Sequence, residues 1–493
     1  MHALRRRPRA SQPQLDRSPA STAPRLAAVA AALALLGLAF APATAAPSQA
    51  IGTNGTDSSA AAPGRAGLAA DAIGVLIDEA LQRNPSLERA RRQALAAEAR
   101  APQAAVRPDP EVSVTLFALP PETRVGPQRV AAGVRQELPL WGKLDLRERR
   151  ALALAEAAWA ELEALRLDVA TAVRTTAYEL AFLDRQEEIV RGERATLERY
   201  DAAAQARYSA GTGMLQEAVR IQAQITRIEA RLLDIAERRA VLLAQLNGLR
   251  DRPSAEPAPP LALPALEAVP AEGAELIARA LDRRPELAAL DARIAAHRIG
   301  EELALRRRKP DLMLGLQYTA VEAREDLAGR TNPPQGNGDD VLTLTGSIRL
   351  PIWSRALEAG IEEARHETSG LEEQRRVLER SIENQIGELT TRLPLLREHH
   401  DLLEGVLLTQ ARESLRSAET AYRTGGIGAV DLLDAEVVLF EVRIAAARTR
   451  TDHAVALARL ERAVGAALDS SRGAQGADTH PEAEGSAAEE ASR

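Results

Sequence analysis

The phrase LPLWGK at residues 138–143 returns as LPIWSR at residues 350–355, and the two copies hold two of the chain's three tryptophans. In each copy, a segment of alternating apolar and polar residues precedes the phrase, and a long charged, alanine-rich run follows it. Proline cannot donate a hydrogen bond to a sheet ladder, so it is typical of the place where a strand ends. The phrase therefore predicts a joint between a strand and a long helix, and this joint occurs twice.

The repetition extends on both sides of the joint. Three further pairs of segments match in the same order, with offsets that grow from 200 to 214 residues: LIDEALQRNPSLERA (76–90) with LIARALDRRPELAAL (276–290), RPDPEVSVTLF (107–117) with RKPDLMLGLQY (308–318), and YSAGTGMLQEAVRIQ (208–222) with YRTGGIGAVDLLDAE (422–436). Ordered matches of this kind indicate a tandem duplication. We assign the first repeat to residues 69–249, a proline-rich linker to 250–270 and the second repeat to 271–468.

The N-terminus has the three parts of an export signal. Early arginines precede an apolar run at residues 26–40, and the small residues 43–45 fit a cleavage site. We expect residues 1–45 to be a signal peptide, with an uncleaved anchor as the alternative, residues 46–68 to be flexible and residues 469–493 to be a disordered tail. Cleavage would remove six arginines and one aspartate and change the formal net charge from −7 to −12, which argues against general nucleic-acid binding.

Helices dominate both repeats. Each repeat is predicted to begin with a helix, at residues 69–107 and 271–309, that ends before a proline. Residues 144–207 contain no proline and would form a helix of roughly 96 Å at 1.5 Å per residue, and residues 356–422 would form a similar helix kinked at Pro394. The last helix of each repeat has the three-and-four spacing of a coiled coil: Ala218, Ile221, Ile225, Ile228, Leu232 and Ile235, then Val430, Leu433, Val437, Phe440 and Ile444.

Short alternating segments lie between the first helix and the joint of each repeat. Their apolar residues are Val112, Val114 and Leu116, Val130, Ala132 and Val134, Leu312, Leu314 and Leu316, and Leu342, Leu344 and Ile348. Such segments are typical of membrane strands, although a pair of soluble hairpins would have the same pattern. In a membrane, Trp141 and Trp353 would anchor at the lipid–water interface, with Lys143 and Arg355 toward the headgroups. The alternative is that each tryptophan packs a strand–helix corner.

The repeat order, the paired hairpins and the stretch at residues 422–436 resemble the outer-membrane efflux protein family, the TolC-like exit ducts of Gram-negative bacteria. The resemblance covers residues 69–468 and rests on the order of the motifs. The form RQELPLWGKLDLR at residues 135–147 looks like members that serve heavy-metal exporters.

The resemblance implies a mainly helical fold with a small β part. Family members are homotrimers in which each protomer gives four strands to one twelve-stranded barrel in the outer membrane, and a coiled-coil duct of helices continues the barrel into the periplasm. Their partners are a periplasmic adaptor, an inner-membrane pump and outer-membrane lipid. Closure of the barrel by trimerisation would pair the sheet edges, which lipid cannot satisfy.

The resemblance also implies a periplasmic gate. Carried over residue by residue, it falls on Tyr422, Asp431 and Asp434, and Glu217 is the first-repeat counterpart of Asp431. In a threefold assembly, the aspartates would form acidic rings that favour cations. Family members place an arginine where this chain has Ile427, so an ion-pair latch would be built differently. The alternative is that Asp431 is only a first-turn acid, which the helix dipole favours.

The same family pattern predicts where the adaptor docks. The glycine-rich turns between paired helices would be the docking tips: Gly211, Gly213, Gly425 and Gly428. The most favoured function is a passive exit duct of a tripartite efflux system for small solutes, including heavy-metal cations. A type I secretion channel is an alternative, and a periplasmic coiled-coil adaptor is a weaker one, because the duplicated helix–hairpin–helix order contradicts a single helical hairpin.

We expect no enzyme, no cofactor and no metal site. The chain has no cysteine, which excludes disulfides and cysteine nucleophiles. We expect His399 and His400 to be a solvated pair rather than a metal site, and the sequence contains neither a zinc-protease motif nor a nucleophile elbow. The sequence WGKL lacks the upstream glycine and the Ser/Thr of a phosphate loop.

Overall fold

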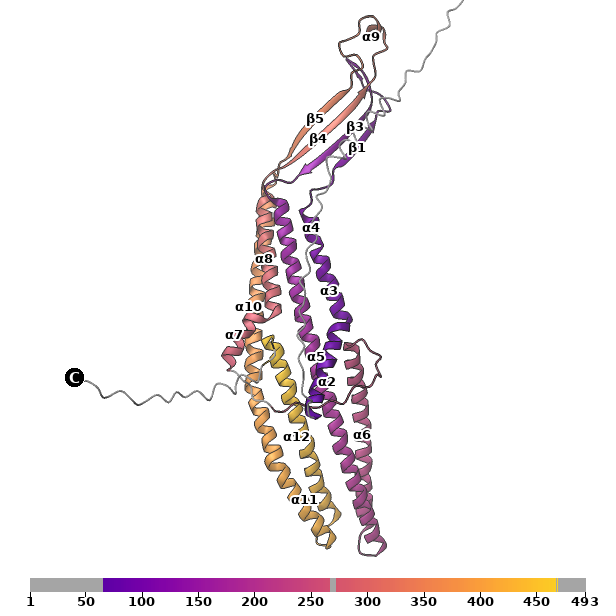
Figure 1. Cartoon of the computed structure of the whole chain (residues 1–493), viewed down its shortest axis with the longest axis vertical. Helices are drawn as coiled ribbons and strands as arrows, with labels where there is room; N and C mark the ends of the chain where they lie inside the picture. Colours follow the sequence, from indigo (N-terminus) through magenta and orange to yellow (C-terminus); the bar gives the residue numbers. More distant parts are fainter. Residues whose placement is uncertain (1–64, 267–271, 467, 469–493) are drawn as a thin grey trace, which may run out of the picture. The chain divides into compact units, whose positions relative to one another are not determined.

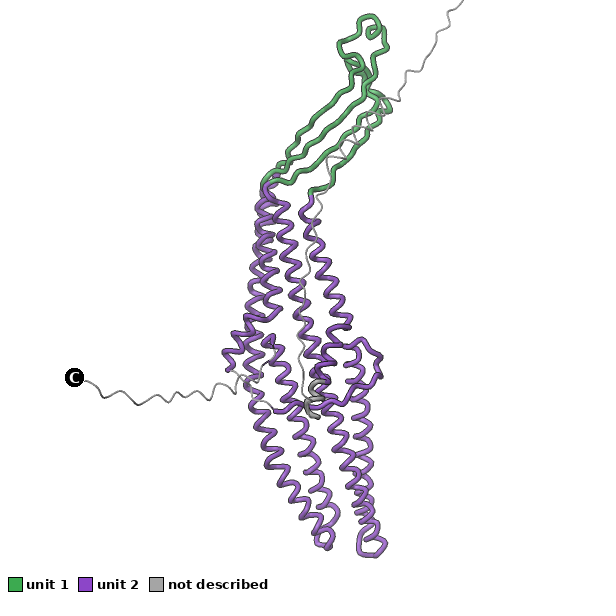
Figure 2. The backbone as a smooth tube through the Cα atoms, in the orientation of Figure 1, with its two compact units in different colours: residues 1–59, 107–140, 309–350 green, residues 60–106, 141–308, 351–493 purple. Residues whose placement is uncertain are grey.

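The computed structural model describes residues 65–266, 272–466 and 468, which form two units (Figure 2). The strand unit holds residues 107–140 and 309–350, and the helical unit holds the other described residues. The expected signal peptide and the expected tail lie outside the described residues.

The strand unit is one antiparallel sheet. Its strands are β1 (Glu111–Leu116), β2 (Glu122–Thr123), β3 (Gly126–Leu138), β4 (Asp311–Val321) and β5 (Val341–Arg349). The order is β1-β3-β4-β5, and the short β2 pairs with β3. The central pairing of β3 with β4 therefore joins the two repeats, while β1 and β5 are the edges. A short helix, α9 (Leu327–Thr331), interrupts the β4–β5 loop and is capped by Asp326.

The register gives the sheet one apolar face. Val134 of β3 lies opposite Val112 of β1 and Leu316 of β4, and Leu316 lies opposite Leu344 of β5. One position further along the strands, the corresponding row is polar or small: Ser113, Gly133, Gln317 and Thr343. Every residue of β1 and β5 is exposed. The predicted alternation is confirmed, and within the described protomer the outer apolar side chains remain uncovered.

The helical unit repeats one order of helices (Figure 1). The first repeat contributes α2 (Arg65–Arg83), α3 (Pro85–Glu98), α4 (Arg100–Ala105), α5 (Lys143–Ser209) and α6 (Leu215–Leu249). The second contributes α7 (Gly273–Arg283), α8 (Pro285–Arg306), α10 (Ser354–Asp401), a π-helix η1 (Leu402–Leu407), α11 (Leu408–Arg423) and α12 (Ala429–Val464). The prediction of a mainly helical chain with a small sheet is confirmed. No described helix is both long and apolar enough to cross a membrane.

The single helices predicted at 69–107 and 271–309 are wrong. Both are broken in front of a proline, at Asn84 and at Arg284, whose ψ angles of 121° and 123° are extended. The residue before a proline avoids the helical region because of a clash with the proline ring. Asn84 also caps the next helix, since its Oδ1 accepts hydrogen bonds from the amides of Ser86 and Leu87.

The two longest helices differ in their continuity. Helix α5 has 67 residues, which corresponds to about 100 Å. Its counterpart continues in α-helical form through Pro394 and first departs from it at η1, which contains Gly405. A π-helical turn holds one extra residue per turn and shifts the face that follows it.

A buried core fills the contact between α5, α6, α11 and α12. The stripe predicted on α6 packs into this core, with Ala218, Ile221, Ile228 and Ile235 buried. The stripe predicted on α12 is only partly buried, since Phe440 is buried but Val430 is exposed, and the fully buried row is instead Leu432, Glu436 and Leu439. A helix that packs against neighbours on two sides buries two seams, and a single heptad describes only one of them.

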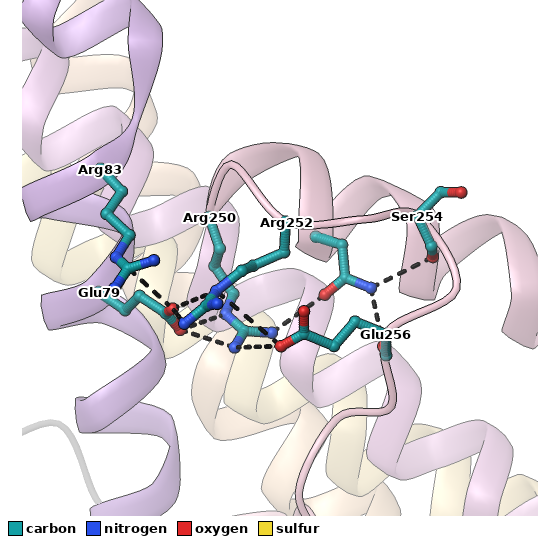
Figure 3. Close-up of polar contacts among 7 residues, drawn as sticks. Glu79, Arg83, Arg250, Arg252, Ser254 and Glu256 are labelled. Atoms are coloured by element: carbon teal, nitrogen blue, oxygen red, sulfur yellow. Dashed lines mark hydrogen bonds and ion pairs between the residues drawn. The ribbon is translucent and has the colours of Figure 1, made fainter.

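The start of the linker is held by a charged network (Figure 3). Glu79 on α2 accepts hydrogen bonds from Arg250 Nε at 2.8 Å and Arg252 Nε at 2.6 Å. Asn247, fully buried on α6, donates to the carbonyls of Ser254 and Glu256. Burial would raise the pKa of Glu79, but the two arginines outweigh it and lower that pKa. The network fixes the linker to the first helix of the chain's helical unit.

Replacing Glu79 with alanine is expected to free this part of the linker. The buried Arg250 would lose its carboxylate, and loss of one partner of a buried pair costs about 3 kcal/mol, or on the order of a 100-fold change in local opening. Trypsin cleavage after Arg250 in the native protein measures this opening, because Pro253 blocks cleavage after Arg252. The control is Glu88→Ala, which removes only the exposed pair with Arg92 and should change cleavage less than about twofold. Equal rates in both variants would contradict the prediction.

Candidate functional site

The candidate site lies at the ends of the two helical hairpins, α5–α6 and α11–α12. Both turns have the same backbone. Gly211 and Gly425 have φ angles of 74° and 76°, the left-handed conformation that glycine adopts without steric cost. The amides of Thr212 and Gly426 then donate back to the carbonyls of Arg207 and Ala421, at 2.9 and 2.8 Å. This is the hydrogen bond that closes a helix end after a left-handed glycine, so the duplication extends to the turn geometry.

The side chains at the two turns differ, and an arginine beside the first turn contacts a tyrosine beside the second turn. The guanidinium of Arg207 on α5 lies 4.6 Å from the centre of the Tyr422 ring on α11. Its Nη1 also donates to the Tyr422 carbonyl at 3.2 Å. The equivalent position in the second repeat is Ala421, which cannot return the contact. The contact between the hairpins is therefore made by the arginine of the first repeat and has no counterpart from the second repeat. Together with Glu217 of α6, Arg207 and Tyr422 form a contact that we call the tip clasp.

Glu217 completes the tip clasp from α6. Its Oε1 faces Gly428, where an added Cβ would stand 3.8 Å away. Tyr422 is 4% exposed, and neither its hydroxyl nor Oε2 of Glu217 has a hydrogen-bond partner of normal geometry within the described residues. Burial, and then the charge of Glu217, raise the pKa of Tyr422. The tyrosine therefore stays neutral beside a carboxylate and a guanidinium.

The other predicted gate residues lie elsewhere on the tip. Asp431 and Asp434 are exposed on the first two turns of α12, and neither makes an ion pair or hydrogen bond in the described protomer. The structure thus separates the four predicted residues into two sets: buried Tyr422 with half-buried Glu217, and an exposed pair of aspartates. Tyr208, the first-repeat counterpart of Tyr422, is also exposed. Sequence matching alone did not indicate this difference or the part that Arg207 plays.

The tryptophans of the joints are accessible. Trp353 is 75% exposed and precedes α10, while Trp141, about half exposed, has a left-handed φ of 66° before α5. These values disfavour a tryptophan packed into a corner of the protomer. Lys143 differs from its prediction, since it is 4% exposed and does not face outward as a headgroup-contacting cation would. Among the described residues, no group of three or more acidic or histidine side chains could hold a metal ion.

The chain combines a small antiparallel sheet with two long helical hairpins, and the known proteins that resemble the chain share this fold. The family model for outer membrane efflux proteins matches residues 76–250 and 276–466. The chain belongs to the outer membrane efflux protein family. No curated protein matches the chain.

Solved structures share the fold at low identity. The outer membrane protein VceC of Vibrio cholerae is 21% identical, with a TM-score of 0.66 over 80% of this chain and 97% of that one. The MtrE outer membrane channel of Neisseria gonorrhoeae is 22% identical, with a TM-score of 0.64 over 80% and 89%. The outer-membrane channel OprN is 18% identical, with a TM-score of 0.69 over 81% and 91%.

Family membership establishes several of the expectations. The chain is an outer-membrane efflux protein, and it is a transport protein rather than an enzyme. Its match in two stretches follows from the duplicated helical plan described above.

Proposed function

We propose that the chain forms a passive homotrimeric exit duct of a tripartite efflux system. Three protomers would close one barrel from their sheets, the helices would continue it into the periplasm, and a pump would supply the energy. Small solutes, with heavy-metal cations among them, are the proposed cargo. The observation that carries the proposal is the apolar sheet face, which no other described element of the protomer covers.

The apolar face supports a lipid environment. Exposed side chains from both edge strands share it: Val112, Val114, Leu116, Leu342, Leu344 and Ile348. A contiguous exposed patch of this kind indicates contact with a membrane or a partner. The outer edges of β1 and β5 have no partner strand in the described protomer, and unpaired edges in lipid cost several kcal/mol per backbone group. Pairing β5 of one copy with β1 of the next would remove that cost, and Trp141 and Trp353 would anchor its border.

The hairpin tips support docking to a periplasmic adaptor. Gly211 and Gly213 lie beside three exposed apolar side chains, Met214, Leu215 and Val219. Apolar side chains that remain in water at a turn are a typical interaction surface. The turn at Gly425 and Gly428 would provide the matching surface of the second repeat.

Cell fractionation and electrophoresis test the proposal. The protein should sediment with the outer membrane and migrate as a trimer in detergent without heating. A soluble periplasmic monomer would overturn the duct and support the adaptor. Loss of secretion of a protein substrate with normal solute resistance in a deletion strain would favour the type I secretion channel instead.

Removing the aspartates should alter ion selectivity. In the proposed trimer, Asp431 and Asp434 would form acidic rings, and neither is neutralised within its own protomer. The double variant Asp431→Ala, Asp434→Ala is expected to lose most of its preference for cations, by about fivefold or more in the permeability ratio, in planar-bilayer recordings. The control is Asp234→Ala on α6. Unchanged selectivity would leave Asp431 as only a first-turn acid of α12.

A further inference from the structure

Two buried carboxyl groups face each other deep between the hairpins. Glu193 on α5 is 3% exposed and Glu436 on α12 is 2% exposed. Their helices pack together in one buried core, and the hydroxyl of Tyr200, two turns beyond Glu193 on α5, lies 3.4 Å from Oε2 of Glu436. Each glutamate is flanked one helical turn away by fully buried apolar residues, Val190 and Leu197 on α5 and Leu432 and Phe440 on α12. We call Glu193 and Glu436 the carboxyl pair.

The neighbouring charges do not neutralise the carboxyl pair. Arg443 on α12 is the cation that acts on Glu193, and no ion pair between it and either glutamate is present among the described residues. From α6, Arg231 lies over the ring of Phe440 and Glu229 pairs with Arg194 at the surface. Oε2 of Glu193 has no hydrogen-bond partner within the described residues.

Tyr200 and Glu419 show which atoms can hold a proton. The Tyr200 hydroxyl on α5 donates to Oε1 of Glu419 on α11 at 2.7 Å, and it lies 3.4 Å from Oε2 of Glu436. Its single proton serves the shorter contact with Glu419, so the longer contact supplies Glu436 with no full hydrogen bond. Burial and the two carboxylates raise the pKa of Tyr200, which keeps it protonated. The proton that joins Glu193 to Glu436 must therefore come from the carboxyl pair itself.

Two ionised carboxylates in this place would repel each other without compensation. Burial removes the water that would stabilise their charge, and the low polarity around them strengthens the repulsion. Burial first, and then Glu436, raise the pKa of Glu193 to about 9. At neutral pH one carboxyl therefore remains neutral and donates to the other.

We propose that the carboxyl pair is a proton-dependent clamp between the two hairpins. While the two carboxyl groups share a proton, the clamp holds α12 against α5. When that proton is lost, α12 can separate from α5. The inference concerns the packing of helices within one protomer, so it does not depend on the transported substrate or on the partners. It differs from the tip clasp, which uses a permanent cation.

The direction of the pH dependence follows from proton linkage. The packed state binds a proton that Glu193, once exposed, releases above its ordinary pKa of 4.5. The clamp is at full strength below pH 4.5 and weakens steadily as the pH rises to about 9. Between pH 7 and pH 10, linkage with these two values gives a loss of on the order of 100-fold in the ratio of packed to separated helices.

Hydrogen exchange of the full-length protein in detergent micelles tests the clamp. Amide protection in residues 186–200 and 430–443 is measured at pH 7 and pH 10 and corrected for the intrinsic exchange rate. The wild type should lose protection by on the order of 100-fold, whereas Glu193→Gln should lose less than about threefold, because a neutral amide can donate at either pH. Glu441→Gln, on the exposed side of α12, is the matched control and should behave as the wild type.

A second variant keeps the test decisive. Glu436→Gln leaves only burial to raise the pKa of Glu193, so its loss of protection should be smaller than that of the wild type, and a folding failure of one variant leaves the other to report. Equal losses of protection in the wild type and in a folded glutamine variant would overturn the clamp. So would a wild type whose protection does not change between the two pH values.

Discussion

Arginine at Leu344 and Val114 is expected to prevent the protein from assembling in the outer membrane. Both side chains are exposed on the apolar face of the sheet, one on each edge strand. An arginine on the lipid side of a membrane strand costs about 2–4 kcal/mol near the bilayer midplane, and a trimer would hold every substitution three times. Trimer formation in isolated outer membranes, followed by unheated electrophoresis, should fall by at least about tenfold.

The opposite face of the same strands provides the control. Thr343 and Thr345 of β5 lie between the apolar positions and point to the polar face. Arginine at Thr345 should leave assembly within about twofold of the wild type, because that face would line the water-filled lumen. If both arginine variants assembled equally well, the apolar face would not face lipid and the proposed barrel would be wrong.

Replacing Arg207 with alanine is expected to open the tips. The change removes the cation–π contact with Tyr422 and the charged hydrogen bond to its carbonyl. Together these contribute about 2 kcal/mol, which corresponds to roughly a 30-fold shift toward separated hairpins. In planar bilayers, the variant should spend far more time in its higher-conductance state.

A matched arginine separates this effect from a change in net charge. Arg220 is exposed on α6, five residues beyond the start of that helix, and no contact of it with α11 or α12 is present among the described residues. Arg220→Ala should leave the conductance unchanged. A larger change in Arg220→Ala than in Arg207→Ala would show that the tip clasp does not hold the hairpins.

The order of the main helices and strands could be predicted because the sequence contains this order in two similar copies. The repeated phrase at Trp141 and Trp353 marks both joints, and alternation predicts β1, β3, β4 and β5. The helix breaks at Pro85 and Pro285 follow from the same pre-proline rule that predicts the helix ends. Local rules of this kind are reliable where one residue decides the backbone.

The side-chain contacts between repeats could not be predicted in the same way. Tyr208 and Tyr422 match in sequence, but only Tyr422 is buried, because its surroundings come from the other repeat. The sequence pattern indicates the carboxyl pair only weakly. Glu193 and Gln186 occupy seam positions of a stripe that Leu183, Val190, Leu197 and Ala204 otherwise fill. A polar residue in such a seam indicates a specific partner, but the sequence does not say which helix supplies it.

The central pairing of β3 with β4 has a consequence for how such a ring could have originated. It joins β3, the last strand of the first repeat, to β4, the first strand of the second repeat. In the proposed trimer, β5 of one copy would pair with β1 of its neighbour, which again places the last strand of one repeat beside the first strand of another. All six junctions between repeats would then be of one kind, with approximate sixfold symmetry. A single-repeat ancestor could have closed the same ring from six copies, and fusion of two genes would have converted a hexamer to a trimer whose halves were then free to diverge.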